Sequence, residues 1–215
     1  MKNILILGLG RFGKHLAQSF VKLGDEVMVV DKDESAIQDV LNVVTYAQIG
    51  DCTNIEVLKS LGVNNFDICF VCIGDGFQSC LETTDLLSSL GAKYIVSKAG
   101  RDIHAKFLLK NGADEVVYPE RDIAEKLAVK YSSNHLIDYF EISEDVAIYE
   151  IFVPESWSGK SIIQLNVRSK YGINILAVKL EDGELISNPG PDFIFSEKEQ
   201  MIVLSSQANV RRFIK

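Results

Sequence analysis

The chain has 215 residues, of which 47% are hydrophobic, 24% charged and 9% aromatic, an ordinary composition for a globular protein. Lys and Arg number 22 against 30 Asp and Glu, and the net charge of −8 argues against a nucleic-acid surface or direct binding to an anionic membrane. No segment approaches the roughly 18 consecutive apolar residues of a membrane span, and the N-terminus lacks a signal-peptide pattern. We therefore expect a soluble protein with one large or two small domains.

Residues 3–120 alternate apolar strands with helical segments, the pattern of a doubly wound parallel sheet. In the first helical segment Phe12, Leu16 and Phe20 recur every four residues, and a sixth helix is predicted over 122–132. The six strands are predicted at residues 4–7, 27–30, 46–49, 68–73, 94–97 and 115–117. Together they fill one Rossmann unit of the α/β class.

The pattern changes near residue 134, where strand signals continue without crossover helices. A strand is predicted over 142–153, and residues 173–180 and 184–187 flank Asp182-Gly183, which favours a tight hairpin turn. A last strand over 201–205 precedes a short helix that ends at Arg211-Arg212-Phe213. We predict a Rossmann domain over 1–134 and a small α+β domain over 135–215.

The motif Gly8-x-Gly10-x-x-Gly13 follows the first strand and opens the first helix, the context that distinguishes a dinucleotide-type fingerprint from a chance match. Gly8 allows a tight turn, Gly10 lets the backbone approach phosphate oxygens, and Gly13 permits close packing of helix on strand. Asp31 ends the second strand, 18 residues past Gly13. Its carboxylate suits a ribose diol and repels a 2′-phosphate, which disfavours NADP.

Other polar residues follow the later strands at the same carboxyl edge, where open α/β sheets bind their ligands. Asp51 is suited to accept a hydrogen bond from an adenine amino group, and Lys98 to meet a phosphate. Arg11, directly after Gly10, carries a planar guanidinium suited to a terminal phosphate, within the chain or across a dimer. The loops concerned are Gly50-Asp51-Cys52, Ile73-Gly74-Asp75-Gly76 and Lys98-Ala99.

Signals for catalysis are weak. The three histidines, His15, His104 and His135, are scattered along the chain, and we find no nucleophile elbow, Walker loop or metal-ligand helix. Cys69 and Cys72 spell C-x-x-C, but residues three apart on a strand point to opposite faces and cannot share a metal. The four cysteines are expected to be reduced thiols.

Several segments together resemble the RCK family of TrkA-N and TrkA-C domains, of the kind found in the cytosolic subunits of bacterial Ktr potassium transporters. The resemblance covers essentially the whole chain. The matching segments are Gly8-Leu-Gly-Arg-Phe-Gly13, Val-Val-Asp31, Asn65-Phe-Asp67, Lys110-x-Gly-Ala-Asp114, Tyr118-Pro-Glu-Arg-Asp122 and Leu165-Asn-Val-Arg168-x-Lys-Tyr-Gly172-Ile-Asn174.

The resemblance implies a non-catalytic regulatory protein that senses ATP or ADP and acts on a membrane potassium-translocating subunit of the KtrB type. It implies dimers that assemble into an octameric ring, in the cytoplasm and attached to the inner face of the membrane through that subunit. Arg11 matches the family's phosphate-sensing arginine, which reaches the nucleotide of a neighbouring subunit. The nucleotide site is expected to comprise Gly8, Gly10, Arg11, Phe12, Gly13, Asp31, Lys32, Asp51, Cys52, Ile73, Gly74, Asp75, Lys98, Ala99 and His104.

Two further sites follow from the resemblance alone. Glu120 matches a carboxylate that binds a divalent cation, Mg²⁺ or Ca²⁺, at the dimer interface, although from sequence alone a first-turn helix carboxylate is the simpler interpretation. Cyclic di-AMP is expected between two copies of the second domain, at Ile162, Ile163, Arg168, Asn174 and Pro191.

Two alternatives stay open, and a third is disfavoured. One is a TrkA-like regulatory subunit that prefers NAD(H), since Asp31 suits either ligand. Another is a small NAD-dependent oxidoreductase. A redox-sensing transcription factor is disfavoured, because the chain has neither a DNA-binding segment nor the basic charge to match.

Overall fold

The computed structural model describes residues 1–74 and 76–212, and the chain divides into two compact units, Met1–Asp122 and Ile123–Lys215. Each unit is described by itself. In the described residues, no helix is both long and apolar enough to cross a membrane.

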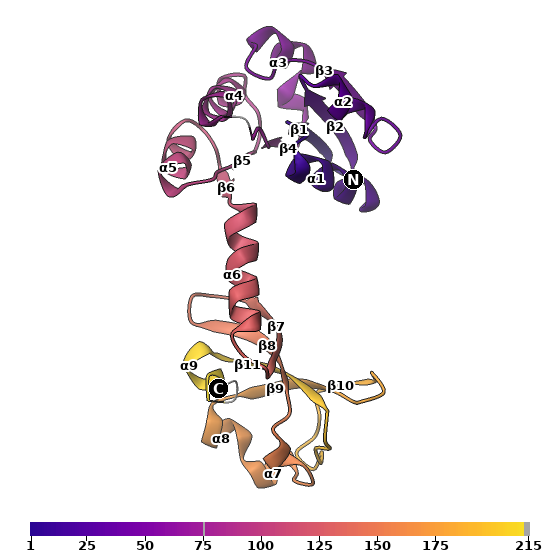
Figure 1. Cartoon of the computed structure of the whole chain (residues 1–215), viewed down its shortest axis with the longest axis vertical. Helices are drawn as coiled ribbons and strands as arrows, with labels where there is room; N and C mark the ends of the chain where they lie inside the picture. Colours follow the sequence, from indigo (N-terminus) through magenta and orange to yellow (C-terminus); the bar gives the residue numbers. More distant parts are fainter. Residues whose placement is uncertain (75, 213–215) are drawn as a thin grey trace. The chain divides into compact units, whose positions relative to one another are not determined.

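The first unit is built on a six-stranded parallel sheet with strand order β3-β2-β1-β4-β5-β6 (Figure 1). This order, with helical connections between the strands, confirms the predicted Rossmann-like fold. The strands are β1 (Asn3–Leu7), β2 (Glu26–Asp31), β3 (Tyr46–Ile49), β4 (Ile68–Val71), β5 (Ile95–Lys98) and β6 (Glu115–Val117). The helices are α1 (Arg11–Lys22), α2 (Glu34–Gln38), α3 (Ile55–Leu61), η1 (Val63–Asn65), α4 (Phe77–Ser89) and α5 (Asp102–Lys110).

Alternate residues of β1 bury into two separate cores, one on each face of the sheet. Ile4 and Ile6 pack with α1 and α2, whereas Leu5 and Leu7 pack with α3, α4 and α5. The cysteines of the C-x-x-C sequence divide in the same way, Cys69 into the second core and Cys72 into the first. A shared metal is therefore excluded, as the sequence predicted.

The fourth strand is shorter than predicted, ending at Val71 rather than at residue 73. Cys72 still donates its backbone N–H to Leu7 O, at 2.7 Å. The neighbouring Gly8 then leaves the extended conformation at φ +98°, so β1 offers Ile73 no further strand partner. The loop that follows β4 therefore begins beside the glycine motif, which places both at the carboxyl edge of the sheet.

Helix α6 (Pro119–Tyr131) begins three residues before its predicted start, and the division between the units falls inside it. Proline suits a first helical position because the N–H that it lacks would have no partner there. None of the residues of α6 is buried. The domain boundary at residue 134 stays a prediction.

The second unit carries a five-stranded antiparallel sheet with strand order β10-β9-β11-β8-β7. Its core includes Trp157 and Phe195. The strands are β7 (Leu136–Glu141), β8 (Val146–Phe152), β9 (Asn174–Lys179), β10 (Leu185–Ser187) and β11 (Gln200–Ser206). The helical segments are η2 (Glu155–Trp157), α7 (Ile162–Leu165), α8 (Val167–Tyr171) and α9 (Gln207–Val210).

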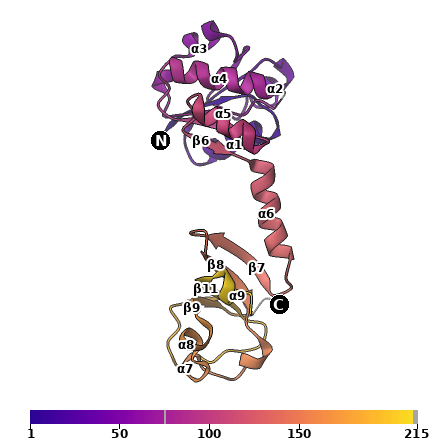
Figure 2. The same ribbon diagram turned by 90° about the vertical axis from the view of Figure 1, so that its left-hand side faces the viewer.

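The hairpin predicted around Asp182-Gly183 is confirmed, with β9 and β10 antiparallel and Gly183 at φ +91°. The strand predicted over 142–153 is present as β8 but begins only at Val146, and the preceding strand β7 was not predicted. Sequence analysis also missed α7 and α8, which Figure 2 shows side by side. They span only four and five residues, too few for a helical period to be recognised. Phe213, at the predicted end of the last helix, lies outside the described residues.

Candidate nucleotide-binding site

The glycine motif forms a tight turn between β1 and α1. At Gly8, with its positive φ, an added Cβ would lie 2.9 Å from Cys72 C and Ile73 N, so no larger residue fits without a shift. At Gly13 an added Cβ would lie 2.1 Å from Gly8 O, so the glycine lets α1 pack directly onto the turn.

Gly10 differs from its two neighbours in the motif. An added Cβ there would meet nothing within 4 Å, and no side chain caps the start of α1 at this residue. The first N–H groups of a helix have no partner inside the helix, and they carry the positive end of its dipole. The open space beside Gly10 therefore suits an anion such as a phosphate.

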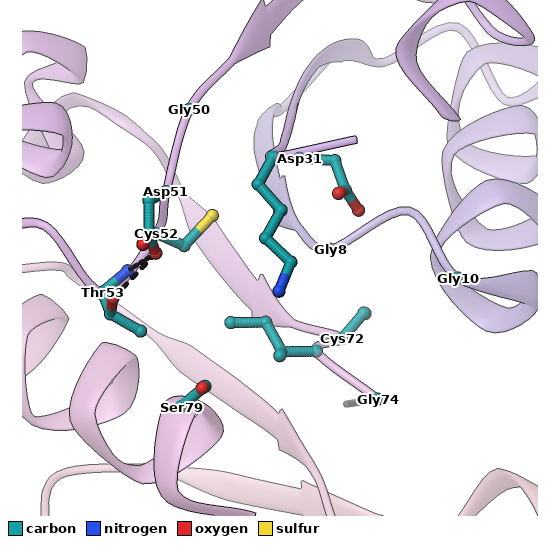
Figure 3. A pocket seen from close by; sticks show the side chains of 12 residues that line it. Gly8, Gly10, Asp31, Gly50, Asp51, Cys52, Thr53, Cys72, Gly74 and Ser79 are labelled. Carbon is teal, nitrogen blue, oxygen red and sulfur yellow. Dashed lines mark hydrogen bonds between the residues drawn. The ribbon is translucent and has the colours of Figure 1, made fainter. Parts of the chain in front are cut away.

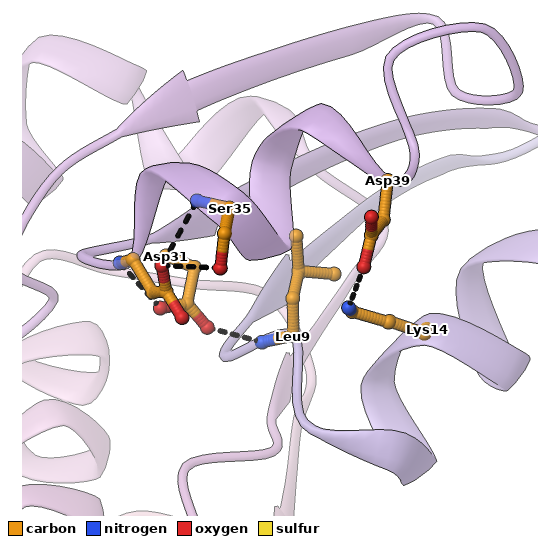
Figure 4. Close-up of polar contacts among 6 residues, drawn as sticks. Leu9, Lys14, Asp31, Ser35 and Asp39 are labelled. Atoms are coloured by element: carbon orange, nitrogen blue, oxygen red, sulfur yellow. Dashed lines mark hydrogen bonds and ion pairs between the residues drawn. The ribbon is translucent and has the colours of Figure 1, made fainter.

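Asp31 holds the loop in shape from the end of β2 (Figure 4). Its Oδ2 accepts a hydrogen bond from Leu9 N at 2.5 Å, and its Oδ1 accepts one from Asp33 N at 2.9 Å. Each carboxylate oxygen has a second lone pair. The side chain can therefore position the loop and still accept hydrogen bonds from ribose hydroxyls.

A cavity of about 180 Å³ lies at the carboxyl ends of β1, β2, β3 and β4. Figure 3 shows Asp51, Cys52 and Thr53 on one side of it and the loop with Gly8 and Gly10 on the other. Eight predicted site residues line this cavity: Gly8, Gly10, Asp31, Lys32, Asp51, Cys52, Ile73 and Gly74. Four more were not among the predicted site residues, although Gly50 belongs to a loop that the sequence placed at this edge: Gly50, Thr53, Cys72 and Ser79. Of these, Thr53 and Ser79 carried no signal beyond a polar loop or helix position.

Asp51 is held in place and ionised by its own loop. Its Oδ1 accepts hydrogen bonds from Thr53 Oγ1 at 2.7 Å and Thr53 N at 2.9 Å. These two bonds lower the pKa of the Asp51 carboxyl, and the charge of Lys32 lowers it further. Asp51 is therefore an acceptor at one end of the cavity.

A second cavity of about 400 Å³ shares Ile73 and Gly74 with the first and lies toward β5. Three further predicted residues line it, Lys98, His104 and Glu120. The His104 ring stacks on Phe77, with centroids 4.0 Å apart and planes at 15°. The remaining lining residues were not among the predicted site residues, although Gly76 belongs to a loop that the sequence placed at this edge: Gly76, Phe77, Cys80 and Gly100.

Charges of both signs meet at the second cavity. Lys98 Nζ donates to Glu120 Oε1 at 2.7 Å, and this bond is the main reason that the pKa of Glu120 lies below its usual range. Arg11, exposed at the start of α1, lowers that pKa further through its charge. Lys98 also lies over the Phe12 ring, 5.9 Å from its centroid.

Some predicted residues lie outside both cavities. Ala99 is buried in the core, where its N–H donates to Val117 O at 2.9 Å. Phe12 is partly buried against the core beneath α1. Arg11 and Gly13 belong to the loop but line neither cavity, and Asp75 lies outside the described residues.

The cysteines near the site are buried and protonated. Burial raises the pKa of Cys52 and of Cys72 to about 12, and that of Cys80 to about 11. Within the described residues, no cluster of three or more His, Cys, Asp and Glu side chains is arranged to hold a metal. A cation at Glu120 would need ligands from a nucleotide or from a second copy of the chain.

The five residues predicted to bind a second messenger lie on the second unit. Ile163 and Pro191 are brought together, since Ile163 N donates to Pro191 O at 2.9 Å. Ile163 and Arg168 are exposed, whereas Ile162 packs against the core. Asn174 begins β9. This site stays a prediction.

Comparison with known proteins decides the family. The TrkA-N domain model matches residues 4–119, and the TrkA-C domain model matches residues 148–215. The chain belongs to the RCK family of TrkA-N and TrkA-C domain proteins. The resemblance predicted from the sequence is thereby confirmed.

This RCK protein has close curated relatives in Bacillus subtilis (strain 168). It is 39% identical to Ktr system potassium uptake protein C over 214 residues, covering 100% of this chain and 96% of the relative. It is 35% identical to Ktr system potassium uptake protein A over 212 residues, covering 99% and 95%. Among solved structures, the GsuK channel bound to NAD matches with a TM-score of 0.66 at 19% identity, over 97% of this chain and 38% of that one. The last likeness concerns the fold alone.

Proposed function

We propose that this protein is a nucleotide-sensing regulatory subunit of a potassium uptake system, with no catalytic role of its own. The observation that carries the proposal is the pair of cavities that meet at Ile73 and Gly74. Asp31 lies at the ribose end, while Lys98 and Arg11 supply positive charge at the other. An adenosine with a chain of phosphates has matching chemistry along its length. The kinship with Ktr potassium uptake proteins supports the potassium role.

We propose ATP and ADP as the ligands, with discrimination at the terminal phosphate. The two nucleotides share almost every contact, and a ligand shifts a conformational equilibrium only through its difference in affinity between the states. Arg11 is the best-suited sensor, because its guanidinium stands at the phosphate loop and is exposed. It is proposed to contact the nucleotide of a neighbouring subunit.

The proposal includes a second copy of the chain. Ile123, Leu127 and Tyr131 are exposed along α6 at intervals of four residues, and they form one apolar stripe on a helix with no buried residue. Such a stripe is favourable only when it is covered, which supports a dimer. We propose that dimers assemble into an octameric ring, docked in the cytoplasm against a membrane potassium-translocating subunit of the KtrB type.

Two further ligands belong to the proposal. A divalent cation, Mg²⁺ or Ca²⁺, would offset the repulsion between the Glu120 carboxylate and a nearby phosphate, and a second copy would complete its ligand set. Cyclic di-AMP would bind between two second units, with Arg168 facing its phosphates.

The test is a comparison of ATP and ADP affinities by calorimetry in Arg11→Ala. We expect the mutant to lose affinity for ATP more than for ADP, so that the ratio of the two affinities approaches one. Lys22→Ala is the matched control, because it removes the same charge at the far end of the same helix. Equal losses for both nucleotides in Arg11→Ala contradict the proposed sensing role.

The alternative ligand is NAD(H). The fold relative that is bound to NAD favours it, and so does Asp31, whose carboxylate can accept hydrogen bonds from a ribose. Competition of NADH against ATP on the wild-type protein distinguishes the two. Tight NADH binding with weak ATP binding replaces the proposed ligand. Hydride transfer with a panel of simple substrates would support the oxidoreductase interpretation instead.

A further inference from the structure

The carboxylate of Glu120 lies where the proposed site expects an anion. Lys98 Nζ is 2.7 Å from Glu120 Oε1, and the charge of Arg11 also acts on Glu120. Of the two cations suited to a terminal phosphate, Lys98 is thus paired with a negative group of the chain itself, and the charge of Arg11 favours the same group. A phosphate that enters the second cavity must compete with this group for Lys98.

The two partners differ in how firmly they are held. Lys98 ends β5, within the hydrogen-bonded sheet, and its side chain is 20% exposed. Glu120 lies in the first turn of α6, and its side chain is 72% exposed. Because the lysine is anchored and the glutamate is free to move into solvent, competition for Lys98 displaces Glu120.

A second ion pair holds the same turn of α6 without facing the cavity. Arg121 Nη1 is 2.8 Å from Asp102 Oδ1, at the start of α5. Among the ion pairs of this turn, Lys98–Glu120 therefore faces the cavity, whereas Arg121–Asp102 lies outside its lining. The effect of breaking the first ion pair can therefore be compared with the effect of breaking the second.

We propose that Glu120 is a built-in competitor for the phosphate end of the nucleotide, which displaces it from Lys98 and thereby removes one of the ion pairs that hold the first turn of α6. The inference rests on the proposed nucleotide site and adds a regulatory step to it. A phosphate oxyanion with several negative oxygens attracts an ammonium group more strongly than one carboxylate does. The free energy by which the Lys98–Glu120 pair stabilises the nucleotide-free protein is therefore lost when nucleotide binds, and nucleotide affinity falls by the same amount.

The test measures ATP, ADP and adenosine binding to the full chain in EDTA at low salt, so that no divalent cation involves Glu120. We expect Glu120→Gln to bind ATP and ADP about two- to fivefold more tightly than wild type, the range of a partly exposed ion pair. Adenosine affinity should not change. Asp102→Asn removes the same charge from the Arg121–Asp102 ion pair and should leave the affinities for ATP, ADP and adenosine unchanged.

Two further measurements report the proposed exchange directly. Hydrogen exchange at Asp122, whose N–H donates to Tyr118 O, should accelerate in wild type when ATP binds, and should be fast in Glu120→Gln with or without ATP. The gain in ATP and ADP affinity from Glu120→Gln should vanish when Lys98 is also replaced by Gln, because Glu120 and the phosphate then have no lysine to compete for.

The results that overturn the inference are specific. It fails if Glu120→Gln binds ATP with wild-type or weaker affinity in EDTA, or if adenosine gains as much as ATP. In those cases wild type still binds nucleotide and the proposed function stands. If wild type binds no nucleotide at all, the proposed function and this inference fail together.

Discussion

Replacing Gly13 by alanine is expected to lower the stability of the first unit, whereas the same change at Gly10 is expected to weaken nucleotide binding and leave stability unchanged. In Gly13→Ala the new methyl would lie 2.1 Å from Gly8 O, whereas real Cβ atoms keep at least about 3.0 Å from such an atom. The helix must therefore retreat from the turn by about 0.9 Å. The obstacle is a backbone carbonyl and not the end of a flexible side chain, so the surroundings cannot yield at low cost.

Overpacking of this kind costs about 1–3 kcal/mol, which outweighs the gain of up to about 1 kcal/mol from replacing glycine inside a helix. In Gly10→Ala the methyl meets open space, and φ is −61°, which alanine adopts freely. Its small loss as an N-cap and the lower entropy of the unfolded chain offset each other, so we expect a change within about 0.5 kcal/mol.

The assay is urea unfolding of the full chain, followed by far-UV circular dichroism and by tryptophan fluorescence. Trp157 is the single tryptophan and is buried in the second unit, so its fluorescence is an internal control. Gly13→Ala should shift the dichroism transition to lower urea and leave the fluorescence transition in place. Gly10→Ala should shift neither, yet weaken ATP binding roughly tenfold or more, because the methyl takes the space proposed for phosphate. The reasoning is refuted if Gly13→Ala unfolds at the same urea concentration as wild type, or if Gly10→Ala binds ATP as tightly as wild type.

Two predictions concern charge. Burial raises the pKa of Cys69 from 9.0 to about 12, so above about pH 9 the unfolded thiol ionises while the folded one does not, and stability falls as pH rises toward 12. Unfolding free energy should therefore fall by up to about 2 kcal/mol for this thiol between about pH 8 and pH 10.5, and Cys69→Ala should show a smaller fall; an equal fall contradicts the assignment. Asp31→Asn should weaken ATP and NADH about tenfold while weakening NADPH less, since the repulsion of a 2′-phosphate is removed. Parallel losses for all three ligands in competition binding would assign Asp31 to loop structure alone.

The sequence by itself determined the first unit almost element by element. Strand positions follow from short apolar runs, and the glycine motif follows from backbone conformations that only glycine adopts at Gly8. The opposite burial of Cys69 and Cys72 follows from the two-residue period of a strand. All of these features are set by neighbouring residues, which is why a single sequence reveals them.

Only the tertiary structure decided which side chains meet. Lys98 and Glu120 pair across 22 residues, and His104 stacks on Phe77, because the order of strands in the sheet brings β5, α4, α5 and the start of α6 around one cavity. The same packing buries Ala99 in the core, away from the site for which it was predicted. Contacts between distant residues depend on strand order and register, and no local pattern encodes either of them.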